Sequence, residues 1–244
     1  DAAAQTSNAI TLTMGSMGSL QWGYSYGGNA GAYDDAGAGA YEEVDDGAPT
    51  GLSHNQIGAT SDNQGISYTS PSLDAGGAAI TVHLGYAPRN TNANLAGGTA
   101  SGAATLGSAQ SLGVTVAHDS GLKFGVYGNE INRLDAAGED SFHGAWYAKY
   151  AFGPISIGYA QSYFNDGKSG AAVAANTAKV VGTANGQFEG DQYVVVLNVN
   201  DNLSVSYASA DDTYDAKAGA AAGSTSGGGA VADVTMSMKS IQAA

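Results

Sequence analysis

The sequence predicts an all-β protein, a transmembrane antiparallel up-and-down β-barrel, and three observations lead to this fold class. Stretches of roughly ten residues alternate between apolar and polar positions, which is the two-residue period of a strand with one wet face. The connections between these stretches alternate strictly between short and long. Aromatic side chains gather near the ends of the stretches, as in the interfacial girdles of membrane barrels.

Loop length is the strongest of these observations. Short connections are predicted at Gly15 to Ser19, Leu73 to Gly77, Asp119 to Gly121, Gly153-Pro154 and Asn200 to Asn202. Long connections are predicted at Gly27 to Gln64, Pro88 to Gly107, Ile131 to Asp140, Asn165 to Glu189 and Asp211 to Ala232. A soluble sandwich has no reason to sort its loops by length, because both ends of every strand meet the same water. A bilayer does, because strands inserted as hairpins need minimal turns on one side.

About eleven strands are predicted between these connections. In chain order they are Ile10 to Met14, Leu20 to Tyr26, Ile66 to Tyr68, Ala78 to Tyr86, Gln110 to His118, Gly121 to Asn129, Ser141 to Phe152, Pro154 to Phe164, Tyr193 to Val199, Leu203 to Tyr207 and Val234 to Met238. An odd number is unusual, since bacterial single-chain barrels close with an even count. The chain also stops mid-strand at Ile241 to Ala244 without a terminal aromatic. We therefore interpret the sequence as an internal piece of a longer barrel, or as the interpretable part of a less complete structure.

Strand periodicity also predicts which side chains share a face. Lipid or a neighbouring subunit is expected against Ile80, Val82, Leu84, Leu112, Val114, Val116, Phe124 and Tyr150. Water is expected against Thr81, His83, Ser111, Thr115, Lys123 and Lys149. Two places depart from this pattern. Gln161 falls on an apolar face, and Val194 and Val196 make their strand apolar on both faces; a bulge or a protein contact would explain either.

Composition agrees with one such domain. The chain has 244 residues, 37 of them glycine and 14 tyrosine, with 8 basic residues against 22 acidic ones and no cysteine. Disulfides and thiolate metal sites are therefore excluded. No apolar run approaches the roughly 18 residues of a membrane helix. A formal charge of −14 with scattered basic residues argues against nucleic-acid binding. Asp1 begins without a signal peptide, which we interpret as a mature or trimmed chain.

The longest connection carries a cluster of acidic side chains. Six acidic residues lie within positions 34–46 of the connection Gly27 to Gln64, together with two tyrosines: Asp34, Asp35, Glu42, Glu43, Asp45 and Asp46, with Tyr33 and Tyr41. Compact domains rarely keep so long an irregular loop unless it has a function. The simpler interpretation is a solvated loop face. Clustered carboxylates also suit Ca²⁺ or Mg²⁺, although the spacing is not that of an EF-hand; no other cofactor is expected.

Several segments together resemble a known family. They are Leu20 to Tyr26, Gly31 to Asp35 with the acidic stretch after it, Gly65 to Pro71, and Tyr86 to Pro88. They resemble the general diffusion porins of Gram-negative bacteria, especially the alphaproteobacterial type. The resemblance covers most of the chain. It implies a sixteen-stranded barrel in the outer membrane, a homotrimer, and passive diffusion of small hydrophilic solutes and ions.

The resemblance also places the pieces of the chain. Residues 1–244 become one porin domain that is incomplete at both ends, with three strands missing before Asp1 and two after Ala244. Residues 27–64 become the outer loop that folds inward and narrows the pore, so the six carboxylates at 34–46 are the predicted pore constriction. Trimer contacts are expected mainly on the early strands, Ile10 to Met14 and Leu20 to Tyr26.

Basic side chains are candidates for the opposite wall of that pore. Strand periodicity points His83, Lys123, Lys149 and Lys239 into the lumen, and Arg89 and Arg133 lie just beyond strand ends near the mouth. Acidic and basic walls facing each other set a transverse field that orients polar solutes and biases ions. Lumen-facing lysines that merely solubilise the wall are an equally good interpretation.

The sequence offers little support for catalysis. It contains no Gly-x-Ser-x-Gly elbow, His-Glu-x-x-His motif or phosphate loop, and its four histidines share no metal-ligand spacing. We therefore predict that the protein is not an enzyme. The alternative to a channel is a secreted or cell-surface β-rich structural or adhesive protein, whose apolar faces would have to pack on a second layer.

Overall fold

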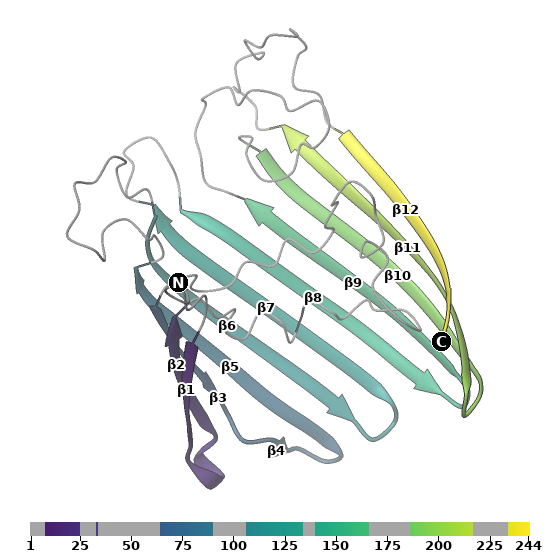
Figure 1. Ribbon diagram of the computed structural model, residues 1–244, viewed down its shortest axis with the longest axis horizontal. Helices are drawn as coiled ribbons and strands as arrows, with labels where there is room; N and C mark the ends of the chain where they lie inside the picture. The colour runs from purple at the N-terminus through teal and green to yellow at the C-terminus, as the bar shows by residue number, and fades with distance from the viewer. Residues whose placement is uncertain are drawn as a thin grey trace, which may run out of the picture.

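A computed structural model describes residues 8–24, 33, 64–89, 106–133, 140–165, 186–216 and 234–244, and they form one antiparallel sheet (Figure 1). The strands are β1 (Asn8–Thr13), β2 (Ser19–Tyr24), β3 (Gln64–Thr69), β4 (Leu73–Asp74), β5 (Ala78–Arg89), β6 (Leu106–His118), β7 (Leu122–Arg133), β8 (Ser141–Phe152), β9 (Ile155–Asn165), β10 (Gly186–Asn200), β11 (Leu203–Ala216) and β12 (Val234–Ala243). A 3₁₀ turn, η1 (Gly15–Met17), joins β1 to β2.

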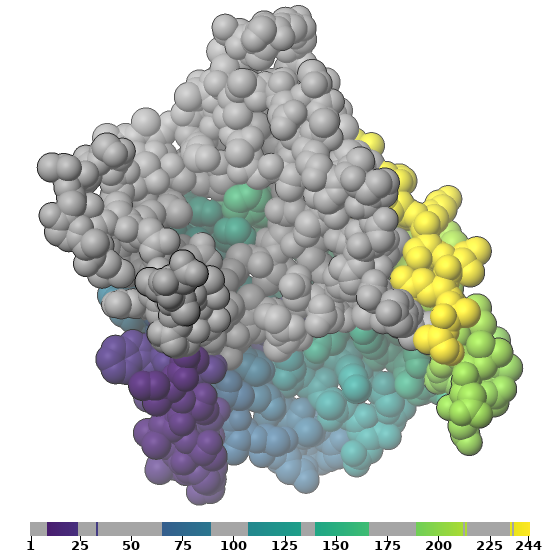
Figure 2. All heavy atoms as spheres, viewed as in Figure 1, coloured from purple at the N-terminus to yellow at the C-terminus, as the bar shows by residue number. Residues whose placement is uncertain are grey.

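The strands follow one another in chain order across the sheet. Eleven of them form a continuous hydrogen-bonded path from β1 to β12, and the two-residue β4 pairs with β5. The predicted all-β, antiparallel up-and-down fold class is therefore confirmed. The path is open: within the described residues β1 and β12 are not paired with each other, and they lie at opposite sides of the molecule (Figure 2).

Tight turns gather along one edge of the sheet, the lower edge in Figure 1. The turn at 119–121 shows why a glycine is needed there. Gly121 has a φ of +91°, and a Cβ at this position would lie 2.3 Å from the carbonyl oxygen of Ala151. The predicted turn at Leu73 to Gly77 is corrected in part, because Leu73 and Asp74 form β4 and only the residues after them turn.

The strands continue beyond their predicted ends on the opposite edge. β5 reaches Arg89, β7 reaches Arg133 and β11 reaches Ala216, where long connections are predicted to have begun. β10 likewise begins at Gly186, before its predicted start. Backbone pairing between neighbouring strands does not require apolar side chains, so the ladder of hydrogen bonds outlasts the hydrophobic alternation.

The two faces of the sheet differ as predicted. Cross-strand pairs join Ile80 to Val116, Val82 to Val114, Leu84 to Leu112, Val116 to Phe124 and Leu122 to Tyr150, and these side chains define the apolar face. The polar face carries the pairs Thr81 to Thr115, His83 to Gly113, Gly85 to Ser111 and Lys123 to Lys149. The predicted separation of the two sets is confirmed, since no residue of one set pairs with a residue of the other.

Apolar burial on the polar face explains the strand that looked apolar on both sides. Val194 is buried there with Ala208 and Ala210, and Val196 and Met238 pack against this group. A contact within the protein therefore accounts for the pattern. Of the two predicted explanations, a bulge or a protein contact, the second is confirmed. No helix among the described residues has the length and apolarity needed to cross a bilayer.

Candidate functional site

Tyr33 is the one described residue of the long segment before β3 begins at Gln64, and it lies on the polar face. The Tyr33 ring is 1% exposed and packs against Tyr127 of β7, with ring centroids 5.0 Å apart. Tyr147 of β8 and His83 of β5 complete the cluster, with centroids 6.4 Å and 5.8 Å from that of Tyr33. Tyr33 therefore rests against four consecutive strands of the path, β5 to β8, counting the glycine of β6 described next.

A missing side chain on β6 makes room for Tyr33. A Cβ at Gly113 would lie 2.2 Å from the Tyr33 hydroxyl oxygen and 2.7 Å from Cζ, well inside contact distance. Gly113 sits between His83 and Tyr127 in the cross-strand register, so the notch opens between two of the rings that Tyr33 contacts. Gly125 makes the same provision for Tyr147, whose Cε1 would meet a Cβ there at 2.2 Å.

The contact of Tyr33 is made by ring packing. Its hydroxyl and Nδ1 of His83 are both buried and have no hydrogen-bond partner within the described part of the chain. Burial raises the pKa of the Tyr33 phenol, and the neighbouring phenols of Tyr147 and Tyr127 raise it further. The phenol therefore stays neutral throughout the physiological range.

The predicted basic residues fall on both faces. His83, Lys123 and Lys149 lie on the polar face, and Lys123 and Lys149 are direct cross-strand partners. Two like charges side by side favour hydration or an anionic neighbour.

The prediction for Lys239 was wrong. It pairs with Ser209, in line with the apolar-face pair Tyr207 and Ile241, whereas Met238 packs on the polar face. Arg89 and Arg133 end β5 and β7 at the edge of the long connections, near the predicted mouth, and the positions of their side chains are outside the described structure.

The six predicted constriction carboxylates lie outside the described residues, and so does the possible Ca²⁺ site that they would form. They are Asp34, Asp35, Glu42, Glu43, Asp45 and Asp46. Within the described part of the chain no group of three or more histidine, aspartate or glutamate side chains is arranged to hold a metal ion. From the sequence, Tyr33 is notable only as a neighbour of these carboxylates, and its contact with the polar face of the sheet is not predicted.

Polar side chains on the apolar face form a hydrogen-bonded chain of their own. Trp146 Nε1 donates to Gln161 Oε1 at 3.0 Å, Gln161 Nε2 donates to Asp191 Oδ1 at 3.1 Å, and the Tyr159 hydroxyl donates to the same oxygen. Gln161 therefore needs no bulge or outside partner. Gln161 lies in the same row of cross-strand partners as Val82 and Val114. One row is thus apolar at β5 and β6 and polar at β9, so the apolar band crosses the rows obliquely, as expected for strands tilted in a membrane.

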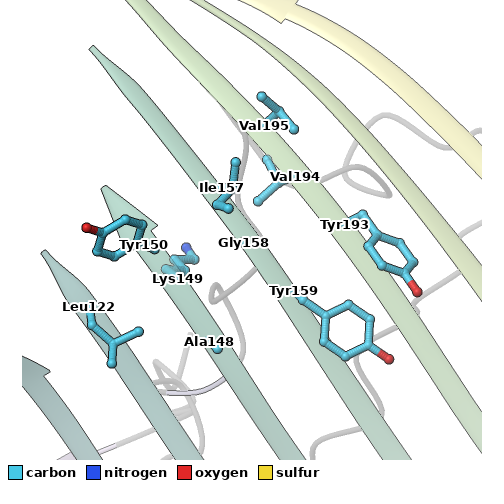
Figure 3. A pocket seen from close by; sticks show the side chains of 10 residues that line it. All are labelled: Leu122, Ala148, Lys149, Tyr150, Ile157, Gly158, Tyr159, Tyr193, Val194 and Val195. Atoms are coloured by element: carbon cyan, nitrogen blue, oxygen red, sulfur yellow. The ribbon is translucent and has the colours of Figure 1, made fainter. Parts of the chain in front are cut away.

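Between this polar chain and the tight turns, the apolar face is indented. A groove of about 370 Å³ lies over the small side chain of Ala148 (Figure 3). Its apolar-face rim consists of Leu122, Tyr150, Ile157, Tyr159, Tyr193 and Val195. Tyr159 and Tyr193 lie toward the polar chain, so the groove belongs to the aromatic and aliphatic surface of that face.

Comparisons with known proteins do not assign a family. No protein-family model matches the chain, and no curated protein matches it. A porin refined at 1.8 Å resolution has a TM-score of 0.47 and 12% identity, with 94% of this chain and 77% of that one covered. OmpT, an outer membrane protein of Vibrio cholerae, has a TM-score of 0.43 and 12% identity, with coverage of 97% and 62%.

An anion-selective porin from Comamonas acidovorans has a TM-score of 0.42 and 10% identity, with coverage of 96% and 58%. This chain thus spans less than two thirds of the length of the last two proteins. Because the TM-scores lie below 0.5 and the identities are 12% or lower, the similarity assigns neither a family nor a function to the chain.

Proposed function

We propose that the chain forms part of an outer-membrane channel for the passive diffusion of small hydrophilic solutes and ions. The observation that supports this most directly is the apolar face. Trp22 is 60% exposed and Ile241 is 80% exposed, and large apolar side chains on the strands between them are also exposed on this face. Fully burying one such side chain is worth about 1.5–3 kcal/mol, so a face of this breadth in water would be strongly unfavourable. Lipid removes that cost.

Two further observations support the proposal. Short turns and long connections are segregated to opposite edges of the sheet, as membrane insertion of hairpins requires. The polar face carries threonine, serine, lysine and glycine, which suit a water-filled lumen. The adhesive or structural alternative would need a second layer on the apolar face, and the described residues contain none.

The free edges of β1 and β12 define a further part of the proposal. Unpaired backbone groups at a sheet edge are not tolerated in hydrocarbon, because each costs several kcal/mol without a partner. We propose that additional strands close the barrel to sixteen. The wall contact of Tyr33 would then lie inside the barrel, where the predicted constriction segment belongs.

Conductance across a planar bilayer tests the function. The complete protein, purified in detergent and added to one side, should produce discrete current steps that are ohmic at low voltage, because a water-filled pore conducts in both directions. Vesicle flotation of the same sample confirms insertion. Inserted protein that gives no steps would contradict the channel. Protein that stays monodisperse without detergent would instead favour the adhesive alternative.

A homotrimer is the second expected property. Ile10, Leu12 and Trp22 present large exposed side chains on β1 and β2, where a like surface can pack closely. The mass of the intact protein in mild detergent, corrected for bound detergent, should equal three chains. Replacing Ile10 and Leu12 with serine should shift the mass toward one chain, whereas the same change at Leu203 and Val205 of β11 should leave it at three. A monomeric mass for the unaltered protein would contradict the trimer.

A further inference from the structure

We propose that Tyr33 fastens the chain at position 33 to the polar face of the sheet, and that Gly113 of β6 is the notch that receives it. Both residues are described, and their contact is specific in a way that general burial is not. The proposal refines the proposed channel, since it names the residue that sets how this part of the chain sits against the wall. It is tested without any measurement of current.

The first argument is the fit of the ring into the wall. The Tyr33 ring occupies the space that an alanine methyl group would need at position 113 of β6. A Cβ at Gly113 would lie 2.2 Å from the Tyr33 hydroxyl oxygen. The ring cannot simply retreat sideways, because Tyr127, Tyr147 and His83 surround it. Close contact between one side chain and one glycine therefore depends on both partners.

The second argument concerns the origin of the attraction. Both buried polar atoms at the contact, the Tyr33 hydroxyl and His83 Nδ1, are unpaired in the described structure. Among the described residues, ring packing and not hydrogen bonding holds the ring in place. Packing of aromatic rings at these separations is favourable in its own right, and an unpaired buried hydroxyl opposes it. Phenylalanine should thus bind the notch at least as well as tyrosine.

Protease cleavage beside Tyr33 measures whether the chain is fastened. Asp34 and Asp35 follow directly, and a protease that cleaves after acidic residues needs several extended residues on each side of the bond. In the complete, membrane-inserted protein, Tyr33→Ala should raise the cleavage rate at these bonds by about tenfold or more, which corresponds to about 1.4 kcal/mol. Tyr33→Phe should leave the rate within about twofold of the parent, since no described residue hydrogen-bonds the hydroxyl.

Glycine variants test the notch itself. Gly113→Ala should raise cleavage in the same direction as Tyr33→Ala. Gly128→Ala is its matched control on the next strand, because a Cβ there meets only Phe142 at 3.6 Å, an ordinary contact. In the double variant, Gly113→Ala should add little to Tyr33→Ala, since the two substitutions remove one interaction.

The outcomes separate this proposal from the channel. Equal cleavage of the alanine and phenylalanine variants of Tyr33, or full additivity of Tyr33→Ala and Gly113→Ala, would overturn the fastening. Should Tyr33→Ala fail to fold, Gly113→Ala against Gly128→Ala decides the question alone. A parent protein that gives the expected cleavage pattern but no conductance would overturn the channel and leave the fastening in place.

Discussion

Replacing Val114 with lysine should lower the free energy of unfolding of the membrane-inserted protein by about 2–4 kcal/mol, the cost of a lysine near the middle of a lipid-facing barrel surface. Val114 pairs with Val82 on one side and Val126 on the other, and Leu112 and Val116 flank it along β6. The lysine would therefore meet apolar neighbours on every side of its strand. Its ammonium group would have to reach the interface or carry water with it.

The adjacent residue supplies the control. Thr115 is next to Val114 on the same strand but on the polar face, where it pairs with Thr81 and Gly125. Thr115→Lys should cost less than about 1 kcal/mol, because its charge meets the water of a lumen.

Guanidinium unfolding from lipid vesicles would measure both variants. The fluorescence of Trp22 and Trp146, which are both exposed, would report the transition. Equal costs for the two lysines would show that the faces do not differ in their surroundings, and the membrane assignment would then be wrong.

The same alternation explains how far sequence reasoning reached. It located eleven strands and separated their faces because successive side chains of a strand point to opposite faces, so apolar side chains for lipid alternate with polar side chains for water. It stopped early at the edge of the long connections, where strands continue past the apolar band. Glu130 of β7 and Glu189 of β10 are paired strand residues there, although charged side chains of this kind are more typical of loops.

The error at Lys239 has a simple physical origin. β12 carries Met238 toward the buried alanines of β11 and Lys239 toward the other face, the reverse of the prediction. Exchanging the faces of a strand needs a shift of only one residue, and a run such as Val234 to Met238 with small neighbours does not fix it. The register is fixed by the pairing of β12 with β11, for example of Ala243 with Val205, and the sequence of neither strand alone shows this pairing.

The contact of Tyr33 could not be predicted for a different reason. It lies in a stretch without periodicity, and nothing local distinguishes it from Tyr41 eight residues later. The informative signal lay elsewhere, in glycines on the polar face of β6 and β7. Gly113 and Gly125 each leave room for an aromatic ring from another segment, which only the three-dimensional arrangement reveals.

Neutralising the acidic stretch that follows Tyr33 should change the ion preference of the channel. The variant replaces Asp34 and Asp35 with asparagine and Glu42 and Glu43 with glutamine. The formal charge of the chain is −14, and this stretch holds six of its 22 acidic residues. Because Tyr33 lies on the polar face, we expect the carboxylates next to it to act on ions in the lumen.

The size of the effect follows from Coulomb's law. A unit charge about 8 Å from an ion in a water-like medium contributes about 0.5 kcal/mol, and screening at about 0.1 M salt removes roughly half of this. Four charges together then supply about 1 kcal/mol, which raises the local concentration of cations about fivefold and lowers that of anions about fivefold, so the local ratio of cations to anions changes by about thirtyfold. The pore should accordingly lose most of a cation preference of that size while assembling normally, because exposed loop charges contribute little to stability.

The reversal potential under a salt gradient measures this change, and it should move toward zero in the quadruple variant. Three other acidic residues provide the control: Asp119 and Asp201 in tight turns and Glu130, whose exposed side chain lies on the apolar face. Neutralising these three removes nearly as much charge from the molecule, so a general surface effect would shift the potential in both variants. A shift confined to the quadruple variant requires that its carboxylates lie near the path of the ions. An unchanged potential would place Asp34, Asp35, Glu42 and Glu43 away from the constriction, even if Tyr33 remains fastened to the wall.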